Sequence, residues 1–169
     1  MTTNQRTEAP FQADERTMLE GWLDFHRETL AAICDGLSDE QLREASAPPS
    51  MLTLLGLVRH MAEVERAWFR RVLPREEIAP IYYTEEDLDG DFRVSDQDTG
   101  KEALATWHAE IAVARENAAR HSLDDTGFWT RKDADVSLRW IYVHMIEEYA
   151  RHNGHADLIR ERIDGATDL

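Results

Sequence analysis

The segment from Leu138 to Ile163 constrains the fold more than any other part of the chain. Apolar residues recur along it at helical spacing, which predicts one long amphipathic helix. The same apolar stripe also passes through Glu148 and His152. A carboxylate and an imidazole are costly to bury unless something binds them. One helical turn separates the two side chains, so they project side by side, at a spacing that suits a shared metal ion.

Three earlier segments show the same helical repeat, and we find no strand-like alternation of useful length. Helices are expected at about residues 12–34, 53–73, 100–120 and 138–164, with a short helical turn after Ser38. Prolines and glycines interrupt the pattern between these segments. The expected fold is therefore all-α, a four-helix bundle formed by residues 12–165 as a single domain, with residues 166–169 as a tail.

The first helix should begin at Ala13 or Asp14 and end before Gly36. Its inward face is expected to contain residues that repeat every three or four positions, namely Met18, Trp22, Phe25, Thr29 and Ile33, with Leu19, Leu23 and Leu30 broadening the stripe. Ser137 is a good N-cap for the last helix, and Gly165 is a good residue to close it.

A long acidic connection joins the second and third helices. Residues 74–99 contain Pro80, Gly90 and the run Glu85–Asp91, all of which discourage regular structure. A connection of this length either covers a site or crosses the bundle as a solvated loop. We favour the solvated loop, anchored by a few hydrophobic residues.

Composition excludes several classes of partner. The formal net charge of −15 argues against nucleic acids and anionic membranes, which bind basic surfaces. No apolar run is long enough for a transmembrane helix, and residues 1–11 lack the apolar segment of a signal peptide. We therefore expect a cytoplasmic protein whose residues 1–11 are a disordered lead-in. The single cysteine, Cys34, excludes an intramolecular disulfide and is expected to fill the core.

His60 is the histidine of the second helix that is directed inward or nearly so. Together with Glu148 and His152 it forms a set of two imidazoles and one carboxylate, which suits Zn, Ni, Fe(II) or Mn. Three protein ligands would leave coordination positions open, as in catalytic rather than structural sites. Spacing alone is equally compatible with a buried polar network that contains no metal.

Other ligand sets compete with this one. His152 and His155 are three residues apart and share a helical face, while His144 and Glu148 repeat the four-residue spacing one turn earlier. We interpret His155 as a fourth ligand or a catalytic base near the substrate. His144 is a weaker catalytic candidate that could support a ligand, and cofactor-binding residues cannot be assigned from the pattern.

Two stretches carry a family resemblance. The segment Gly56–Phe69, which contains His60, and the segment His144–Asp157, which contains His-Asn-Gly-His-Ala-Asp, resemble the DinB-like superfamily of four-helix metalloproteins. The closer similarity is to the actinobacterial subgroup that includes the so-called mini-circle protein. The resemblance implies one metal-ligating histidine on the second helix and a histidine pair on the last helix. His60 and His152 match two of these ligands, whereas Glu148 stands where the superfamily has the first histidine of the pair.

The resemblance also implies a function. Some relatives are thiol-dependent transferases and isomerases, in which a divalent metal lowers the pKa of the thiol of mycothiol or bacillithiol. We therefore expect a metal-dependent enzyme, a mycothiol-type S-transferase or a hydrolase that activates water. It would use one divalent metal, Zn before Ni, Fe or Mn, and act on a small-molecule thiol and an electrophile. The alternative is a non-enzymatic metal-binding protein of stress physiology that functions as a homodimer.

Overall fold

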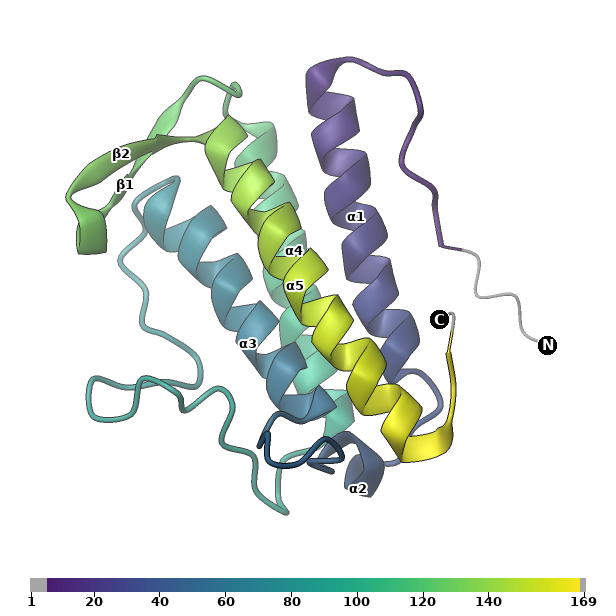
Figure 1. Cartoon of the computed structure of the whole chain (residues 1–169). Helices are drawn as coiled ribbons and strands as arrows, with labels where there is room; N and C mark the ends of the chain where they lie inside the picture. Colours follow the sequence, from purple (N-terminus) through teal and green to yellow (C-terminus); the bar gives the residue numbers. More distant parts are fainter. Residues whose placement is uncertain (1–5, 168–169) are drawn as a thin grey trace.

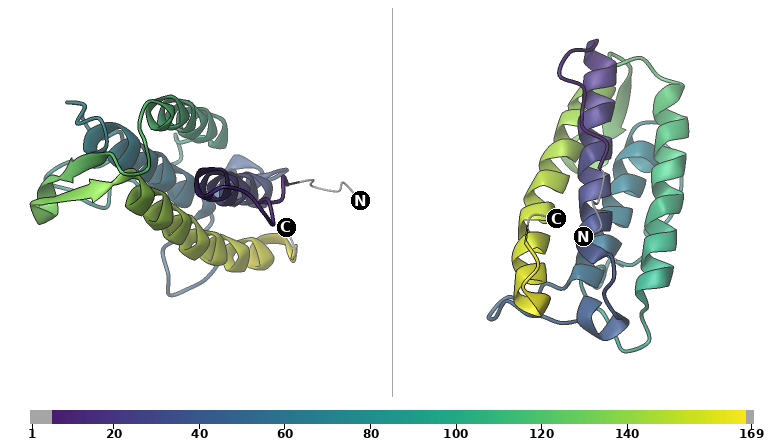
Figure 2. Two further views of the ribbon diagram at one scale, coloured as in Figure 1. Left: turned by 90° about the horizontal axis from the view of Figure 1, so that it is seen from above. Right: turned by 90° about the vertical axis from the view of Figure 1, so that its right-hand side faces the viewer.

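Four long helices lie side by side in the computed structural model, which describes residues 6–167 (Figures 1 and 2). They are α1 (Glu15–Cys34), α3 (Leu54–Arg66), α4 (Gly100–Ala119) and α5 (Leu138–Asp164). Helix α1 packs chiefly on α5, and α3 packs on α4 and α5. The expected all-α four-helix bundle is confirmed. Within residues 6–167, no helix is long and apolar enough to cross a membrane.

The helix ends follow the capping residues of the sequence. A side-chain oxygen at each N-cap accepts a hydrogen bond from a backbone N–H of the first turn, at Asp14, Thr53, Thr99 and Ser137. The short helix α2 (Asp39–Leu42) begins with the capping box between Ser38 and Gln41. Gly165 closes α5 with a φ of 80°, a conformation that favours glycine.

Two elements differ from the sequence expectation. The second helix is α-helical only to Arg66 and continues as a π-helix over Ala67–Val72. Between α4 and α5 the chain forms a small antiparallel hairpin of β1 (Thr126–Trp129) and β2 (Ala134–Ser137), joined by the 3-10 turn Thr130–Lys132. These four-residue strands are too short for alternation to reveal them. Trp129 of this hairpin packs against the bundle, with its ring 5.1 Å from that of Trp68.

The inward face of α1 agrees with the expected one in part. Leu23, Leu30 and Ile33 are buried as predicted, whereas Trp22 is 45% exposed. The inward face also contains Arg27, a charged residue that a search for apolar stripes cannot place there. Residues 6–11 of the expected lead-in lie against the outer face of α1. Ala9 is buried there, and a side chain at Gly21 would meet Pro10 at 2.6 Å. Residues 1–5 of that lead-in lie outside the described residues.

The interior combines an apolar core with one buried polar network. Aliphatic and aromatic side chains from all four long helices form a continuous cluster. Within it, Arg27 binds both carboxylate oxygens of Glu65 at 2.8 Å. Tyr149 donates to Glu65, and the indole N–H of Trp107 donates to the Tyr149 hydroxyl. Every member of this network is therefore paired, as buried polar groups must be.

Candidate metal centre

His60, Glu148 and His152 converge between α3 and α5. One potential ligand atom from each lies within 4.8 Å of the other two. Oε2 of Glu148 is 3.4 Å from Nε2 of His152 and 4.0 Å from Nε2 of His60. The three side chains are 20%, 18% and 12% exposed for His60, Glu148 and His152. The structure thus brings the three predicted ligands together at a site that solvent can reach.

The separations fit a single transition-metal ion. Two donors that each lie about 2.1 Å from one ion can be at most about 4.2 Å apart. The two separations from Glu148 Oε2 satisfy this limit, and the ligand atoms of the two histidines lie within 4.8 Å of each other, so that small side-chain shifts would complete the site. Two imidazole nitrogens and one carboxylate oxygen also form a donor set that divalent transition metals accept. A metal ion therefore fits the residues present.

The three side chains interact electrostatically. Burial opposes protonation of His60, but hydrogen bonds to Asp91 and Glu148 outweigh this effect and raise its pKa to about 9. Hydrogen bonds from His152 and His60 hold the pKa of Glu148 well below its usual range. The site is therefore an ionised carboxylate beside a protonated histidine, and a cation that displaces the proton would find a negative ligand in place.

Asp91 is a residue of this site that the sequence pattern did not identify. Its Oδ2 lies 2.7 Å from Nδ1 of His60, on the opposite side of the ring from Glu148. The Phe92 ring stacks on His60, with centroids 4.6 Å apart. Part of the long acidic connection therefore contacts the site, and the expectation of a solvated crossover is wrong for this part. Asp91 ends an acidic run whose other carboxylates are exposed or partly exposed, so composition did not distinguish it.

His144 lies next to the three convergent residues but is not one of them. Its Nε2 is 3.7 Å from Oε1 of Glu148, and its ring stacks on Trp140 with centroids 4.9 Å apart. Together with Glu147 and Glu148 it forms a second group of potential ligands, one turn nearer the hairpin. Glu147, however, is 45% exposed and pairs with Arg151, which is ordinary for a helix surface.

His155 lies on the other side of His152, with ring centroids 5.4 Å apart. Its Nδ1 is buried and has no hydrogen-bond partner among the described residues, and the same is true of Nδ1 of His152. Burial is the main effect that lowers the pKa of His155, followed by the neighbouring His152 and Arg151. The structure thus places an imidazole with a free nitrogen beside the candidate site.

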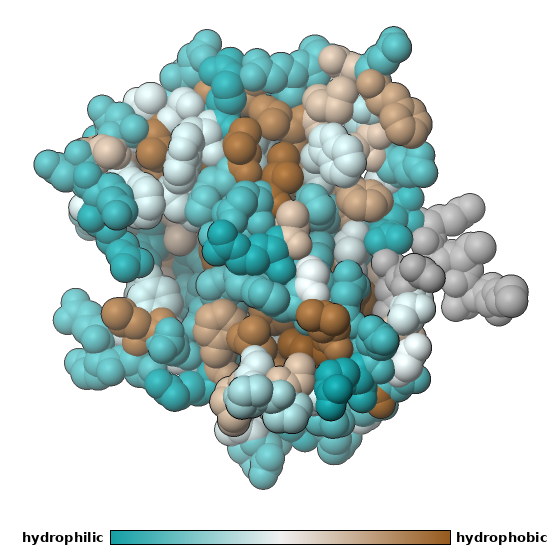
Figure 3. Space-filling view, in the orientation of Figure 1, coloured by the Kyte–Doolittle hydropathy of each residue, from teal (hydrophilic) through white to brown (hydrophobic). Residues whose placement is uncertain are grey.

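The surrounding surface is mixed in character. On the face formed by α3 and α5, hydrophilic residues gather between two hydrophobic patches (Figure 3). Near the hairpin, the rings of Trp68, Trp129 and Trp140 pack against one another with centroids 5.1 to 5.9 Å apart. Trp140 remains 40% exposed. Polar groups at the centre and an exposed aromatic ring nearby are common features of small-molecule sites.

The bundle and the convergent His–Glu–His group define a four-helix protein of the DinB-like type. Comparison with family profiles makes this specific: the Mycothiol-S-transferase profile matches residues 18–165, and the chain belongs to that family. Among solved structures, a conserved protein from Enterococcus faecalis is similar, with a TM-score of 0.62 and 15% identity over 92% of this chain and 100% of the other. That likeness concerns the fold alone. No curated protein matches the chain.

Proposed function

We propose that this protein is a divalent-metal-dependent transferase that joins a low-molecular-weight thiol of the mycothiol class to an electrophile. The observation that carries the proposal is the convergence of His60, Glu148 and His152 from two helices. Membership of the mycothiol S-transferase family supports the choice of thiol.

His60, Glu148 and His152 would hold the metal. A divalent ion bound there would lower the pKa of a thiol and so supply a thiolate nucleophile at neutral pH. Zinc is the ion we expect first, because two histidines and a carboxylate are a common zinc ligand set. Three protein donors leave room for a thiol or a water.

His155 is the residue that we propose for proton transfer. The thiol must lose its proton before its sulfur forms a bond to the electrophilic carbon, and the leaving group departs with the bonding electrons. The His155 ring lies beside the His152 ring, and its unpartnered Nδ1 could accept that proton. His144 would instead orient Glu148 from the opposite side, at 3.7 Å.

The test combines metal analysis with a conjugation assay. Protein purified without a histidine tag or chelator should carry about one divalent ion per chain and should consume mycothiol in the presence of an alkylating electrophile. His152→Ala should lose both properties, whereas His108→Ala, on the exposed face of α4, should lose neither. Absence of a divalent ion would refute the proposal. A bound metal without thiol consumption would favour the non-enzymatic metal-binding function.

A further inference from the structure

The long connection between the π-helix and α4 reaches the candidate metal centre through one buried carboxylate. The Asp91 side chain is 7% exposed, and its Oδ2 lies 2.7 Å from His60 Nδ1. Its other oxygen, Oδ1, accepts a hydrogen bond from the backbone N–H of Phe92 at 3.1 Å. Both oxygens are thus engaged, one with the loop itself and one with the histidine.

We propose that Asp91 is the positioning residue of the metal centre, and that Arg59 and Glu63 fasten the loop so that Asp91 reaches His60. This inference rests on the proposed metal site but assigns a function to the loop as well. A histidine that ligates a metal through one nitrogen usually donates its other N–H to a carboxylate, carbonyl or water. That contact selects the tautomer, fixes the ring and makes the ligand more basic. Asp91 accepts the hydrogen bond from Nδ1 of His60 and so leaves Nε2 as the nitrogen that would bind the metal.

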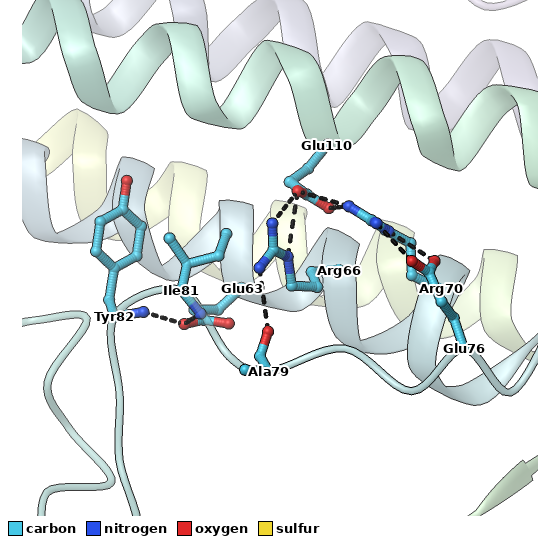
Figure 4. A network of polar contacts seen from close by, with 8 residues as sticks. All are labelled: Glu63, Arg66, Arg70, Glu76, Ala79, Ile81, Tyr82 and Glu110. Atoms are coloured by element: carbon cyan, nitrogen blue, oxygen red, sulfur yellow. Dashed lines mark hydrogen bonds and ion pairs between the residues drawn. The ribbon is translucent and has the colours of Figure 1, made fainter.

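The fastening begins at Glu63, one helical turn after His60. One of its carboxylate oxygens accepts hydrogen bonds from the backbone N–H groups of Ile81 and Tyr82 (Figure 4). The same oxygen accepts a hydrogen bond from the backbone N–H of Tyr83 at 3.4 Å. Three successive amides are therefore held by a single side chain of α3. Burial is the main effect that raises the pKa of Glu63, against the hydrogen bonds that lower it.

Arg59, the residue before His60, holds the other end of the loop. Its guanidinium donates to the carbonyl oxygens of Gly90 and Arg93, each at 3.1 Å, and pairs with Asp98. It also lies over the Tyr82 ring, 4.4 Å from the centroid. Arg59 thus holds the backbone on both sides of Asp91, at Gly90 and at Arg93. Because Arg59 and His60 are neighbours on α3, the same helix positions both the loop and the histidine.

The arrangement implies that loop order and metal binding are coupled. If Asp91 improves the affinity of His60 for a metal, the bound metal must stabilise the Asp91 contact by the same factor. The stacked Phe92 ring adds a second contact that depends on the orientation of His60. Segment 81–93 is therefore expected to exchange its amides more slowly when the metal is bound.

The test compares Co²⁺ and Zn²⁺ affinity in the metal-free forms of the wild type, Asp91→Ala and Asp91→Asn. The affinity corrected for the proton that His60 loses should fall about 10- to 100-fold in Asp91→Ala, and Asp91→Asn, which keeps an acceptor but not the charge, should fall between. The matched control is Asp96→Asn, an exposed carboxylate of the same loop, which should stay within about twofold because water screens an exposed charge. The visible spectrum of bound Co²⁺ should change in the Asp91 variants and not in the control.

Amide exchange supplies a readout that does not require bound metal. In the metal-free protein, Glu63→Ala should speed exchange at residues 81–83, and Asp91→Ala should do so at 90–93, with the helices still protected. If the wild-type protein bound neither Co²⁺ nor Zn²⁺, the proposed function itself would be refuted. Wild-type protein that binds while Asp91→Ala binds equally well, with an unchanged Co²⁺ spectrum, would overturn the inference about Asp91 alone.

Discussion

The hydroxyl of Tyr149 donates a 2.7 Å hydrogen bond to Oε1 of Glu65, joining α5 to α3 inside the bundle. Tyr149 follows Glu148 in the chain, and the two residues project from different faces of α5. The contact therefore fixes the rotation of α5 at the turn that presents Glu148 to His60. A buried polar network thus supports the geometry of the candidate metal centre.

Removing Glu65 should destabilise the protein strongly. Glu65→Ala leaves Arg27, which is 6% exposed, as a buried and partly unpaired cation. We expect a loss of about 3–5 kcal/mol in the free energy of unfolding, as for other broken buried ion pairs. Tyr149→Phe should cost less, about 1–3 kcal/mol, because it removes two hydrogen bonds, to Glu65 and from Trp107, but leaves no buried charge unpaired. Urea denaturation measures both, and a larger loss for Tyr149→Phe would contradict this account.

The histidines should differ sharply in their effect on metal content. His60→Ala and His152→Ala each remove a convergent donor and should abolish stable metal binding. His144→Ala should retain the metal with affinity reduced by at most about tenfold, as expected for a residue that supports a ligand. Elemental analysis and competition with a chelator give these values. If His144→Ala halved a stoichiometry of two ions per chain, the second ligand group would be a real site.

Metal binding should release a proton. His60 in the metal-free protein has a pKa of about 9, so at pH 7 it is protonated and a metal must displace that proton. Through this group alone, the affinity for the metal should therefore increase about tenfold for each unit of increasing pH up to about pH 9. Above that pH, His60 carries no proton to displace and the affinity should be constant. Calorimetry in buffers of different ionisation enthalpy counts the protons released. If no proton were released at pH 7, the metal would not displace a proton from His60.

Replacing Glu148 by histidine tests the residue at which this chain departs from the histidine pattern of the superfamily. Glu148→His keeps a donor at the position but removes the carboxylate that helps to raise the pKa of His60. We expect a metal still to bind, with fewer protons released at pH 8. The matched control is Glu147→His, because Glu147 faces His144 rather than His60. Equal proton release in wild type and Glu148→His would contradict the electrostatic account of the site.

Much of this fold could be predicted because helical patterns and caps are local. Ser137 and Gly165 mark the ends of α5, and His60, Glu148 and His152 could be grouped because side chains on apolar stripes must meet in the core. The inward position of Arg27 in α1 was not predicted, because it is explained only by its partner Glu65 on another helix.

Asp91 was missed for a related reason. Its contact with His60 spans 31 residues and depends on an irregular loop, so no spacing rule connects the two. The loop is held against the bundle by side chains of α3, Glu63 and Arg59, which no local pattern of the loop reveals. Sequence patterns identify ligands on helices far better than residues that position them from loops.

Two glycine substitutions separate the effect of the loop from that of helix stability. A Cβ at Gly90 would lie 2.4 Å from the carbonyl oxygen of Tyr82, so Gly90→Ala must shift the backbone next to Asp91. We expect metal affinity to fall about tenfold, comparable to the loss of a supporting contact. Gly154→Ala is the matched control, because a Cβ there meets nothing within 4 Å on the exposed side of α5.

Gly154→Ala should raise the free energy of unfolding by about 0.5–1 kcal/mol through helix propensity alone. Its metal affinity should equal that of the wild type, although it lies only two residues from His152. Thermal unfolding measures the stability of both variants, and metal titration measures their affinity for the metal. Unchanged affinity in Gly90→Ala would mean that His60 keeps its orientation without the loop, and the coupling between loop order and metal binding would have to be abandoned.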